Sequence, residues 1–561
     1  MKRVEADQLW VSGRRGERDS TIQVCAVVSL LHEEPDINSC TRLFRDQPVL
    51  AWTLSRIGLV DGVKTTVVLC WDDQTRAASD IAELAGATLV RKGPRLVTRN
   101  IRAIATARAW ADGWRGGLLG STAFDRGFHA RFVREAAECV GCDHVLLVDA
   151  AAALVDPELL NQLVERVRPP VSVATTPERY AFNLAMPGTG GIILGPDALK
   201  ELEKSHAHPG SLLSYHPDRP AREPTSTRAC VPANRRVARS LASLLLDSQR
   251  QIDAIEHAAA GASLADMERL VDRVEQFKSF EPSPRDVVIE LTTRRRCTPV
   301  WSILSKQSVD RCDMKPDTAL QIAVELAGAG DVRVTFAGVG DPLLHPDFAE
   351  IMRAFRDAGV RHLHVETDLI ELAQVNLDAL IACEIDAVSV HIPAMTHASY
   401  QAVMGVDAIG QVLENVRRLV TAKAQVPASL PLLVPTFVKC KSNQGEMEEW
   451  VDQWLRASGS AVVRGASDLG GMIDDASPVT MAPPLRRACR RLSSSLHVLS
   501  DGSITTCDQD VLARQVVANV SSVGLLATWR TKLRGAFDQH EQGAWDQYAS
   551  CRNCKQWDRP A

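Results

Sequence analysis

Four cysteines near the C-terminus constrain this chain more than any other feature. They are Cys489, Cys507, Cys551 and Cys554, and the last two form a CxxC pair. Just before Cys507, the turn signal Asp501-Gly502 separates two short apolar runs, so the sequence predicts a β-hairpin over residues 496–506. Four thiolates are the ligand set of a 4Fe-4S cluster, and they also suit a structural zinc ion. The pattern therefore predicts one metal site that uses all four cysteines, with iron-sulfur as the main interpretation and zinc as the alternative.

The bulk composition predicts a globular chain of several domains. Its 561 residues exceed what one hydrophobic core holds, and 45% of them are hydrophobic while 24% are charged. A net charge of −5 and an aromatic content of 5% argue against a general nucleic-acid binder. Residues 1–20 are polar, and the longest apolar stretch near the N-terminus, residues 24–31, is too short to span a membrane. We therefore expect a cytoplasmic protein without membrane association, whose 14 cysteines are reduced thiols or metal ligands.

The first part of the chain, residues 21–205, alternates apolar strand-like runs with helical patterns. The runs are residues 22–28, 65–70, 144–148 and 171–174. Continuous apolar strands separated by helices predict a Rossmann-like α/β domain, with a parallel sheet covered on both faces. Residues 206–235 are rich in proline and arginine and predict a long loop. Helical patterns at residues 235–259 and 263–279 complete a predicted linker region over residues 206–284.

A second α/β series starts at residue 285. Its apolar runs are residues 286–291, 332–336, 362–365, 387–390 and 432–434. Repeating strand and helix units predict a full or partial (β/α) barrel over residues 285–470, with function at the C-terminal strand ends. Residues 471–561, which carry the four cysteines, are expected to form a small metal module.

Two sets of motifs give the second half of the chain a family resemblance. The first set comprises residues 290–294, the glycine-rich stretch 336–346, the segment Ser389-Val390-His391 and residues 405–419. These segments resemble the barrel of radical S-adenosylmethionine (SAM) enzymes, and the cysteine spacing Cx12Gx4C followed by CxxC resembles their SPASM extension. The resemblance implies a 4Fe-4S cluster on the four cysteines and a SAM pocket that uses Gly338, Gly340, Asp341 and Ser389. The alternative interpretation of the two glycines is a tight turn.

The loop after the first barrel strand departs from the radical SAM pattern. The family needs Cx3Cx2C there, so that three thiolates leave one iron open to SAM. With Cys297 as the first ligand, the other positions hold Trp301 and Leu304; in the alternative register, the three positions hold Arg295, Pro299 and Ser302. Neither register supplies three thiolates. We therefore predict that the SAM-cleaving cluster is lost or rebuilt, with Cys297 as a remnant ligand, and that the arginines at 294–296 bind an anion or form a solvated turn.

The first domain resembles sugar-nucleotide cytidylyltransferases in three segments. They are residues 41–54, 146–160 and 190–194. The resemblance implies a nucleotidyltransferase that holds Mg²⁺ and a nucleotide through Arg42 and Asp149. Two departures argue against activity: residues 29–41 contain no glycine to cradle phosphates, and four alanines follow Asp149 in place of a second carboxylate. A further CxxC, formed by Cys139 and Cys142, predicts a helix end rather than a metal site.

Three functions are consistent with these patterns. The leading hypothesis is a radical SAM/SPASM-like iron-sulfur protein with a C-terminal cluster, fused to a nucleotidyltransferase-like domain. The second is an active cytidylyltransferase or other nucleotide-sugar enzyme with the barrel as an accessory module. The third is a non-catalytic scaffold derived from both kinds of enzyme. The substrate stays open between a small molecule, a peptide and a nucleotide sugar.

Overall fold

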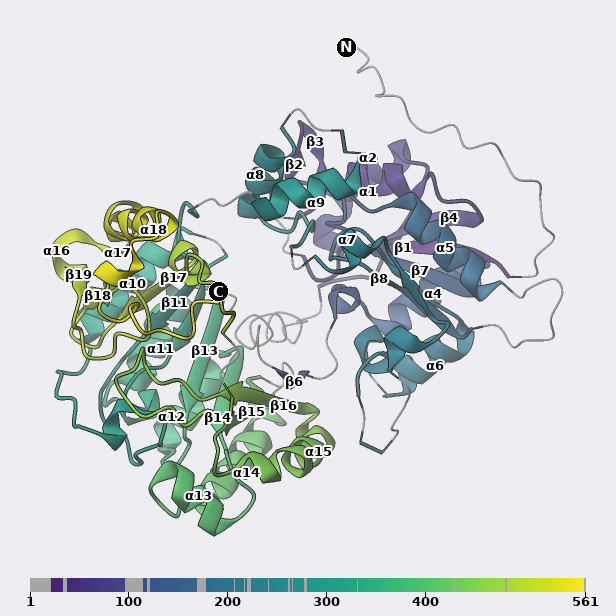
Figure 1. Cartoon of the computed structure of the whole chain (residues 1–561). Helices are drawn as coiled ribbons and strands as arrows, with labels where there is room; N and C mark the ends of the chain where they lie inside the picture. The colour runs from purple at the N-terminus through teal and green to yellow at the C-terminus, as the bar shows by residue number, and fades with distance from the viewer. Residues whose placement is uncertain are drawn as a thin grey trace.

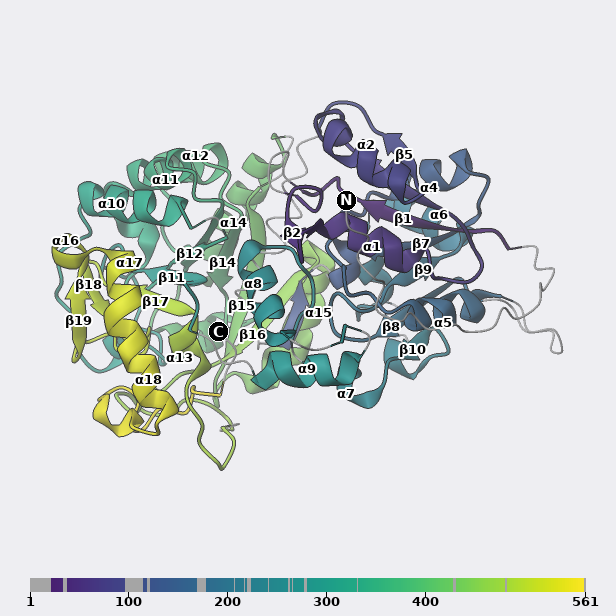
Figure 2. The ribbon, with the colours of Figure 1, turned by 90° about the horizontal axis from the view of Figure 1, so that it is seen from above.

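The structure is a computed structural model of the whole chain. It describes residues 22–33, 38–95, 115–118, 122–168, 178–205, 207–215, 217–218, 223–240, 242–260, 263–264, 266–276, 280–329, 331–426, 430–479 and 482–558. Two large sheets, each with its own helices, stand side by side in these residues (Figures 1 and 2). The chain is therefore a mixed α/β protein with two parallel-sheet parts.

The first sheet has seven strands in the order β10-β8-β9-β7-β1-β4-β5. They are β1 (Val24–Ser29), β4 (Val63–Cys70), β5 (Thr88–Arg91), β7 (His144–Asp149), β8 (Tyr180–Leu184), β9 (Ile192–Leu194) and β10 (Cys230–Pro232). The flanking helices are α1 (Val49–Ile57), α2 (Thr75–Leu84) and α5 (Pro157–Val167) on one core, and α4 (Ala130–Cys139) and α6 (Pro196–Ser205) on the other. Strand β1 is buried along its length, and its side chains alternate between these two cores. The sheet is covered on both faces because its central strands are apolar on both.

The structure confirms three of the four strands predicted in this part, and residues 171–174 lie outside the described residues. The predicted parallel sheet is confirmed for β1, β4, β5 and β7, but β9 departs from it because it runs antiparallel to both β7 and β8. The stretch predicted as a long loop contributes β10, which pairs in parallel with β8. Its buried apolar residues, Cys230 and Val231, are too few to mark a strand in a segment rich in proline and arginine.

The helix predicted at residues 235–259 was also wrong in one respect, because it is two helices, α7 (Arg235–Ala238) and α8 (Gln249–Ala258). Between them, the N–H groups of Leu244 and Leu246 donate hydrogen bonds of 2.8 Å to backbone carbonyls of the first domain. These tertiary bonds hold the segment extended, and Ser248 then caps α8. The second predicted helix is present as α9 (Met267–Gln276). Helices α8 and α9 pack on the first core, so this region is not a free linker.

The second sheet has ten strands in the order β19-β18-β17-β11-β12-β13-β14-β15-β16-β6. Six consecutive strands run parallel, namely β11 (Asp286–Ile289), β12 (Arg333–Phe336), β13 (His362–Thr367), β14 (Ala387–His391), β15 (Leu432–Lys439) and β16 (Ser460–Gly465). The helices between them are α10 (Pro316–Ala327), α11 (Phe348–Asp357), α12 (Gln374–Ala382), α13 (His397–Met404), α14 (Ile409–Lys423) and α15 (Met447–Ser458). The five predicted strands are confirmed, and β16 is an addition. Because these six strands are parallel, their carboxyl ends lie along the same edge of the sheet. This edge is where a functional site is expected.

The C-terminal segment extends this sheet beyond β11, at the end opposite to β16. Strands β17 (Ser495–Val498) and β18 (Ser503–Thr505) form the predicted hairpin, and β19 (Val516–Asn519) follows. Gly502 has a φ of +80°, and Asp501 accepts a hydrogen bond from the N–H of Ser503 (2.9 Å), as the turn signal predicts. Strand β17 pairs in parallel with β11. The short helices α16 (Val520–Val523) and α17 (Leu525–Thr528), and then α18 (Arg534–Glu541), lead to the CxxC turn.

The two parts of the molecule contact each other directly. Strand β6 (Arg115–Leu118), from the first part of the chain, pairs antiparallel with β16 at the edge of the second sheet (Figure 1). Nearby, Asp218 accepts a hydrogen bond from Arg456 of α15 (2.8 Å). Arg250 of α8 is buried and pairs with Asp331 (2.8 Å), which lies just before β12. Among the helices that the structure describes, none combines the length and the apolar character needed to cross a bilayer.

Candidate functional site

The structure gathers the four C-terminal cysteines from three segments of the chain; we call this group the cysteine site. Cys489 precedes a 3-10 turn (Arg490–Ser493), Cys507 follows the β17–β18 hairpin, and Cys551 and Cys554 lie in the turn after residues 545–547. Cys551 and Cys554 raise the pKa of the Cys507 thiol, and Cys489 raises the pKa of the Cys551 thiol. The thiols therefore lie close enough to interact electrostatically. Hydrogen bonds also join the three segments, so they are neighbours in the fold.

Burial leaves the cysteine site protonated until a cation binds. Burial is the largest cause that raises the pKa of all four thiols, to about 12 for Cys551 and about 11 for Cys554. A soft metal that takes thiolates must displace these protons and then neutralises the buried charge. Cys554 Sγ already accepts a hydrogen bond from the N–H of Gln556 (3.2 Å), the kind of contact that supports a ligand sulfur. These donors fit an iron-sulfur cluster. Over the described parts of the chain, no three His, Cys, Asp or Glu side chains are grouped around the position of a single metal ion.

A second polar group lies at the carboxyl ends of the strands of the second sheet; we call it the strand-end network. Its members are Arg295, Cys297, Glu366, Asp368, His391 and Arg464. Arg295 binds Asp368 through two hydrogen bonds of 2.7 Å, and the Cys297 thiol donates to the same carboxylate at 3.0 Å. His391 lies 3.0 Å from both Asp368 and Glu366, and Arg464 donates to Glu366 at 2.8 Å. The network is a chain of alternating charges.

The charges of the strand-end network hold one another in place. Burial opposes ionisation of Asp368, but Arg295 and His391 outweigh it and hold the pKa of Asp368 well below its usual range. Arg464 and His391 lower the pKa of Glu366 in the same way. Burial lowers the pKa of His391, yet its hydrogen bonds to the two carboxylates raise it overall. Burial and Asp368 raise the pKa of Cys297, so the remnant cysteine is a protonated thiol engaged within the protein.

The residues expected to form a SAM pocket are packed against protein. A Cβ added at Gly338 would lie 2.7 Å from the Glu290 side chain, and one at Gly340 would lie 2.3 Å from the backbone oxygen of Thr292. The glycines therefore allow close packing of two loops, as the tight-turn interpretation requires. The Asp341 carboxylate accepts hydrogen bonds from Thr367 Oγ1 and from the N–H groups of Leu343 and Asp368. Ser389 is buried, with its Oγ 2.8 Å from His364 Nε2.

The basic run at residues 294–296 divides between the interior and the surface. Arg295 is buried, whereas Arg294 pairs with Asp313 and Arg296 with Glu371 on the exposed side of the loop. The prediction of a solvated basic turn was therefore wrong for the central arginine. Its partner Asp368 follows β13 directly, and His391 ends β14. Polar residues at the ends of neighbouring parallel strands are the signal in the sequence that could have indicated this network.

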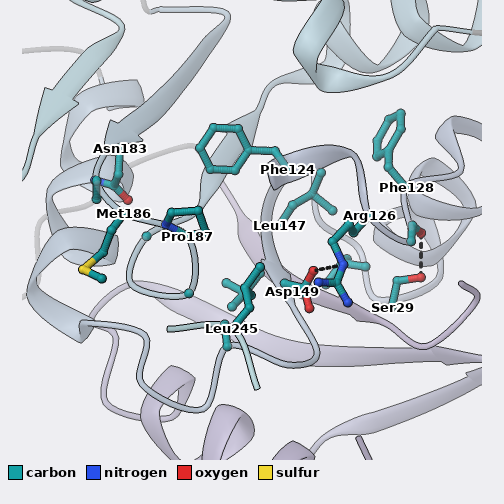
Figure 3. A pocket seen from close by; sticks show the side chains of 17 residues that line it. Ser29, Phe124, Arg126, Phe128, Leu147, Asp149, Asn183, Met186, Pro187 and Leu245 are labelled. Atoms are coloured by element: carbon teal, nitrogen blue, oxygen red, sulfur yellow. Dashed lines mark hydrogen bonds and ion pairs between the residues drawn. The ribbon is translucent and has the colours of Figure 1, made fainter. Parts of the chain in front are cut away.

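In the first domain, the candidate residues Arg42 and Asp149 are each bound to another side chain. Arg42 pairs with the buried Glu33 at 2.9 Å, beside the small hairpin of β2 (Leu43–Phe44) and β3 (Gln47–Pro48). Asp149 ends β7 and lies 3.2 Å from the Nε of Arg126, which also pairs with Asp247. A cavity of about 50 Å³ lies beside this pair, lined by apolar side chains such as Phe124 and Met186 (Figure 3). A second carboxylate, which the residues after Asp149 do not provide, is thus supplied by Asp247 from a distant segment. The Arg126 guanidinium neutralises it.

The CxxC of the first domain is the helix end that the sequence predicts. Helix α4 ends at Cys139, which is exposed, and Gly141 continues the turn with a φ of +66°. Cys142 is buried in the second core of this domain. Within the described residues, the pair has no further cysteine or histidine grouped with it as a metal site.

Comparison with known proteins assigns two segments of this chain to families. Residues 300–436 match the model of the radical SAM superfamily, and residues 489–555 match the model of SPASM, an iron-sulfur cluster-binding domain. The chain therefore contains a radical SAM domain and a SPASM domain, the domain types that use SAM and 4Fe-4S clusters. The first match begins at Val300, beyond Cys297, and the second spans the whole cysteine site.

The individual relatives are distant. An uncharacterized protein of Treponema pallidum is 21% identical over 206 residues, which are 35% of this chain and 57% of that protein. The chain thus spans little more than half the length of this relative. SuiB of Streptococcus suis, solved with S-adenosylmethionine, is 15% identical with a TM-score of 0.40, over 48% of this chain and 72% of SuiB. A cytidylyltransferase of Leptospira borgpetersenii is 13% identical with a TM-score of 0.29, over 46% of this chain and 93% of that enzyme.

Proposed function

We propose that this chain is an iron-sulfur protein of radical SAM/SPASM type that holds a single 4Fe-4S cluster, at the cysteine site, and does not assemble a SAM-cleaving cluster. In this proposal, residues 285–470 form a partial (β/α) barrel and residues 471–561 form the cluster module. The observation that supports this proposal most directly is the bidentate contact of Arg295 with Asp368. The same carboxylate also accepts a hydrogen bond from the Cys297 thiol. These side chains fill the exit of the first barrel strand, where the family binds its catalytic cluster.

The chemistry of the strand-end network supports this proposal. A cluster ligand must be a thiolate that is free to bind iron, whereas the Cys297 thiol donates a hydrogen bond of 3.0 Å to the buried Asp368 carboxylate. Separating Arg295 from Asp368 would leave an unpaired buried charge, at a cost of about 3–5 kcal/mol. The remaining ligand positions hold no second cysteine in either register. Arg464 of β16 reaches Glu366 of β13 across two intervening strands, which supports a curved, barrel-like sheet.

Within the same proposal, residues 21–205 are a Rossmann-like, nucleotidyltransferase-like domain that does not transfer nucleotides. Arg126 lies against Asp149 and Asp247, so Mg²⁺ would have to displace a guanidinium from both carboxylates. Arg42 is held by Glu33 and not directed to a phosphate. The cavity beside Asp149 favours nucleotidyl transfer as the second candidate function. Release of pyrophosphate from a nucleoside triphosphate with Mg²⁺, lost in Asp149→Asn, would establish that second function.

The main proposal is tested by counting iron. The chain is purified without oxygen and reconstituted with iron and sulfide, and the spectrum of the reduced protein is recorded with and without SAM. We expect about four irons per chain, their loss in Cys551→Ser, no change in Cys297→Ser, and no response of the cluster to SAM. About eight irons, or a SAM response that disappears in Cys297→Ser, would overturn the claim that the barrel cluster is lost. Bound zinc without iron would overturn the cluster itself.

A further inference from the structure

The three segments that carry the cysteine site are joined to one another in pairs by arginine side chains. Arg486, three residues before Cys489, donates to the backbone oxygens of Cys551 (2.6 Å) and Arg552 (3.3 Å). Arg491, two residues after Cys489, donates to Asp508 (2.6 Å), next to Cys507. Arg514 donates to Ser550 Oγ (3.0 Å), next to Cys551. Each pair of cysteine-bearing segments thus has one arginine contact.

Arg486 makes the contact that depends most on the planar shape of a guanidinium. Besides its two carbonyl acceptors, it lies over the ring of Trp545, with 5.1 Å between Cζ and the ring centroid. A flat fork can donate in its plane and stack on a ring at the same time, whereas an ammonium group cannot.

Arg491 and Asp508 add a matched pair of charges beside two ligands. Arg491 donates a hydrogen bond of 2.6 Å to the Asp508 carboxylate, and both side chains are half-buried. Arg491 lies two residues after Cys489 and Asp508 lies next to Cys507, so this pair places one positive and one negative charge beside these two cysteines. The two residues therefore act on the same sulfurs with opposite signs.

Arg514 is held by the loop that follows Cys507. The Asp510 carboxylate is buried and accepts hydrogen bonds from the backbone N–H groups of Arg514 (3.2 Å) and Gln515 (2.9 Å). This fixes the backbone at residue 514, from which the side chain reaches Ser550. The contact ties the Cys507 loop to the CxxC turn.

We propose that Arg486, Arg491 and Arg514 are positioning residues that hold the cysteine-bearing segments in place before a cluster binds, and that the Arg491–Asp508 pair sets the reduction potential of that cluster. This inference rests on the proposed function, because it takes the cysteine site to be the cluster site. Four thiolates and a cluster carry net negative charge, so nearby guanidinium groups favour the bound state. Reduction adds one more electron, so each neighbouring charge shifts the potential according to its sign.

The positioning role is tested by iron release and by amide exchange. In the reconstituted chain, Arg486→Gln is expected to lose iron to a chelator about tenfold faster than the native protein, and Arg486→Lys should not restore the native rate. Arg490→Gln is the matched control, because it removes the same charge next to Cys489. Arg490 is exposed and makes none of the three contacts. In the metal-free chain, the amides of Cys551 and Cys554 should exchange faster in Arg486→Gln than in the native protein. Equal release and exchange rates in Arg486→Gln and the control would overturn the role.

The electrostatic role is tested by the reduction potential of the reconstituted cluster, measured by titration with dithionite. Arg491→Gln should shift the potential to more negative values, and Asp508→Asn should shift it to more positive values. A merely structural contact would move both variants in the same direction, because both break the same hydrogen bond, and that result would overturn the inference. If the native chain takes up no iron, the proposed function fails; if it loads normally and the variants behave like the control, only this inference fails.

Discussion

The cysteine site and the strand-end network are both largely shielded polar groups, but only the second has its charges paired within the protein. In the strand-end network, every carboxylate is paired with a guanidinium or an imidazole of the protein. The cysteine site holds four thiols whose pKa values are raised, and its nearest charges come from arginines around it. A buried group that is satisfied internally has no need of a ligand, whereas a group of buried thiols gains from a cation. This difference supports the proposal that a cluster binds at the cysteine site and not at the strand-end network.

Removing one cysteine should separate the two regions most clearly. We expect Cys507→Ser to abolish cluster binding, because a serine hydroxyl is a poor substitute for a soft thiolate. The chain should lose nearly all of its iron, measured by a colorimetric assay after reconstitution. Cys440→Ser, at a buried cysteine away from the cysteine site, is the control and should keep its iron. Iron retained in Cys507→Ser would show that the four cysteines do not act as one site.

Breaking the strand-end network should affect stability without affecting iron. Arg295→Met leaves Asp368 buried without its main counter-charge, so we expect a loss of about 3–5 kcal/mol in the free energy of unfolding of this part of the chain. Arg295→Lys keeps the charge but not the two-pronged contact and should fall between the native protein and Arg295→Met. Urea unfolding followed by tryptophan fluorescence measures both. A change in iron content in either variant would contradict the independence of the two regions.

Asp341 gives the strand-end region a predicted pH dependence. Burial and the charge of Asp368 raise the pKa of Asp341 to about 6, compared with about 3.9 in an unfolded chain. Because the folded value is the higher one, its contribution to stability is complete below about pH 4 and is lost as the pH rises through about 6. We therefore expect the urea midpoint to fall across this range in the native protein and to fall less in Asp341→Asn. Parallel pH profiles for the two proteins would refute this assignment.

The smallest effect on stability is expected at Arg296, in the loop that also carries Arg295. Arg296 pairs with Glu371, but the Arg296 side chain is 60% exposed. An exposed ion pair contributes at most about 1 kcal/mol, so Arg296→Ala should leave the unfolding midpoint nearly unchanged. Together with Arg295→Met, it tests whether burial, rather than the presence of an ion pair, decides the stability of this loop. A loss as large as that of Arg295→Met would remove the distinction.

Local signals in the sequence predicted several parts of the molecule well. The apolar runs predicted β1, β4 and β7 of the first sheet and β11 to β15 of the second, because these strands carry most of the buried apolar residues of the two sheets. Asp501 and Gly502 predicted the hairpin because a tight turn needs these residue types. Strand β10 and the break before α8 escaped prediction, since Cys230, Leu244 and Leu246 take their conformation from contacts with distant parts of the first domain. The strand-end network escaped for the same reason, because its six residues are isolated polar positions along about 170 residues of sequence.

The sequence by itself supplied four cysteines at the spacing of a SPASM extension, and it supplied no three cysteines at the Cx3Cx2C spacing in the loop after the first barrel strand, because residue identity and spacing belong to the chain. Only the tertiary structure decided what stands in place of those thiolates. Arg295, Asp368 and His391 come from three different strand ends, and their pairing depends on the sheet that brings those ends together. The same holds for Arg126 against Asp149 and for the arginines around the cysteine site. Ligand chemistry is local to a residue, whereas charge compensation depends on neighbours that only folding supplies.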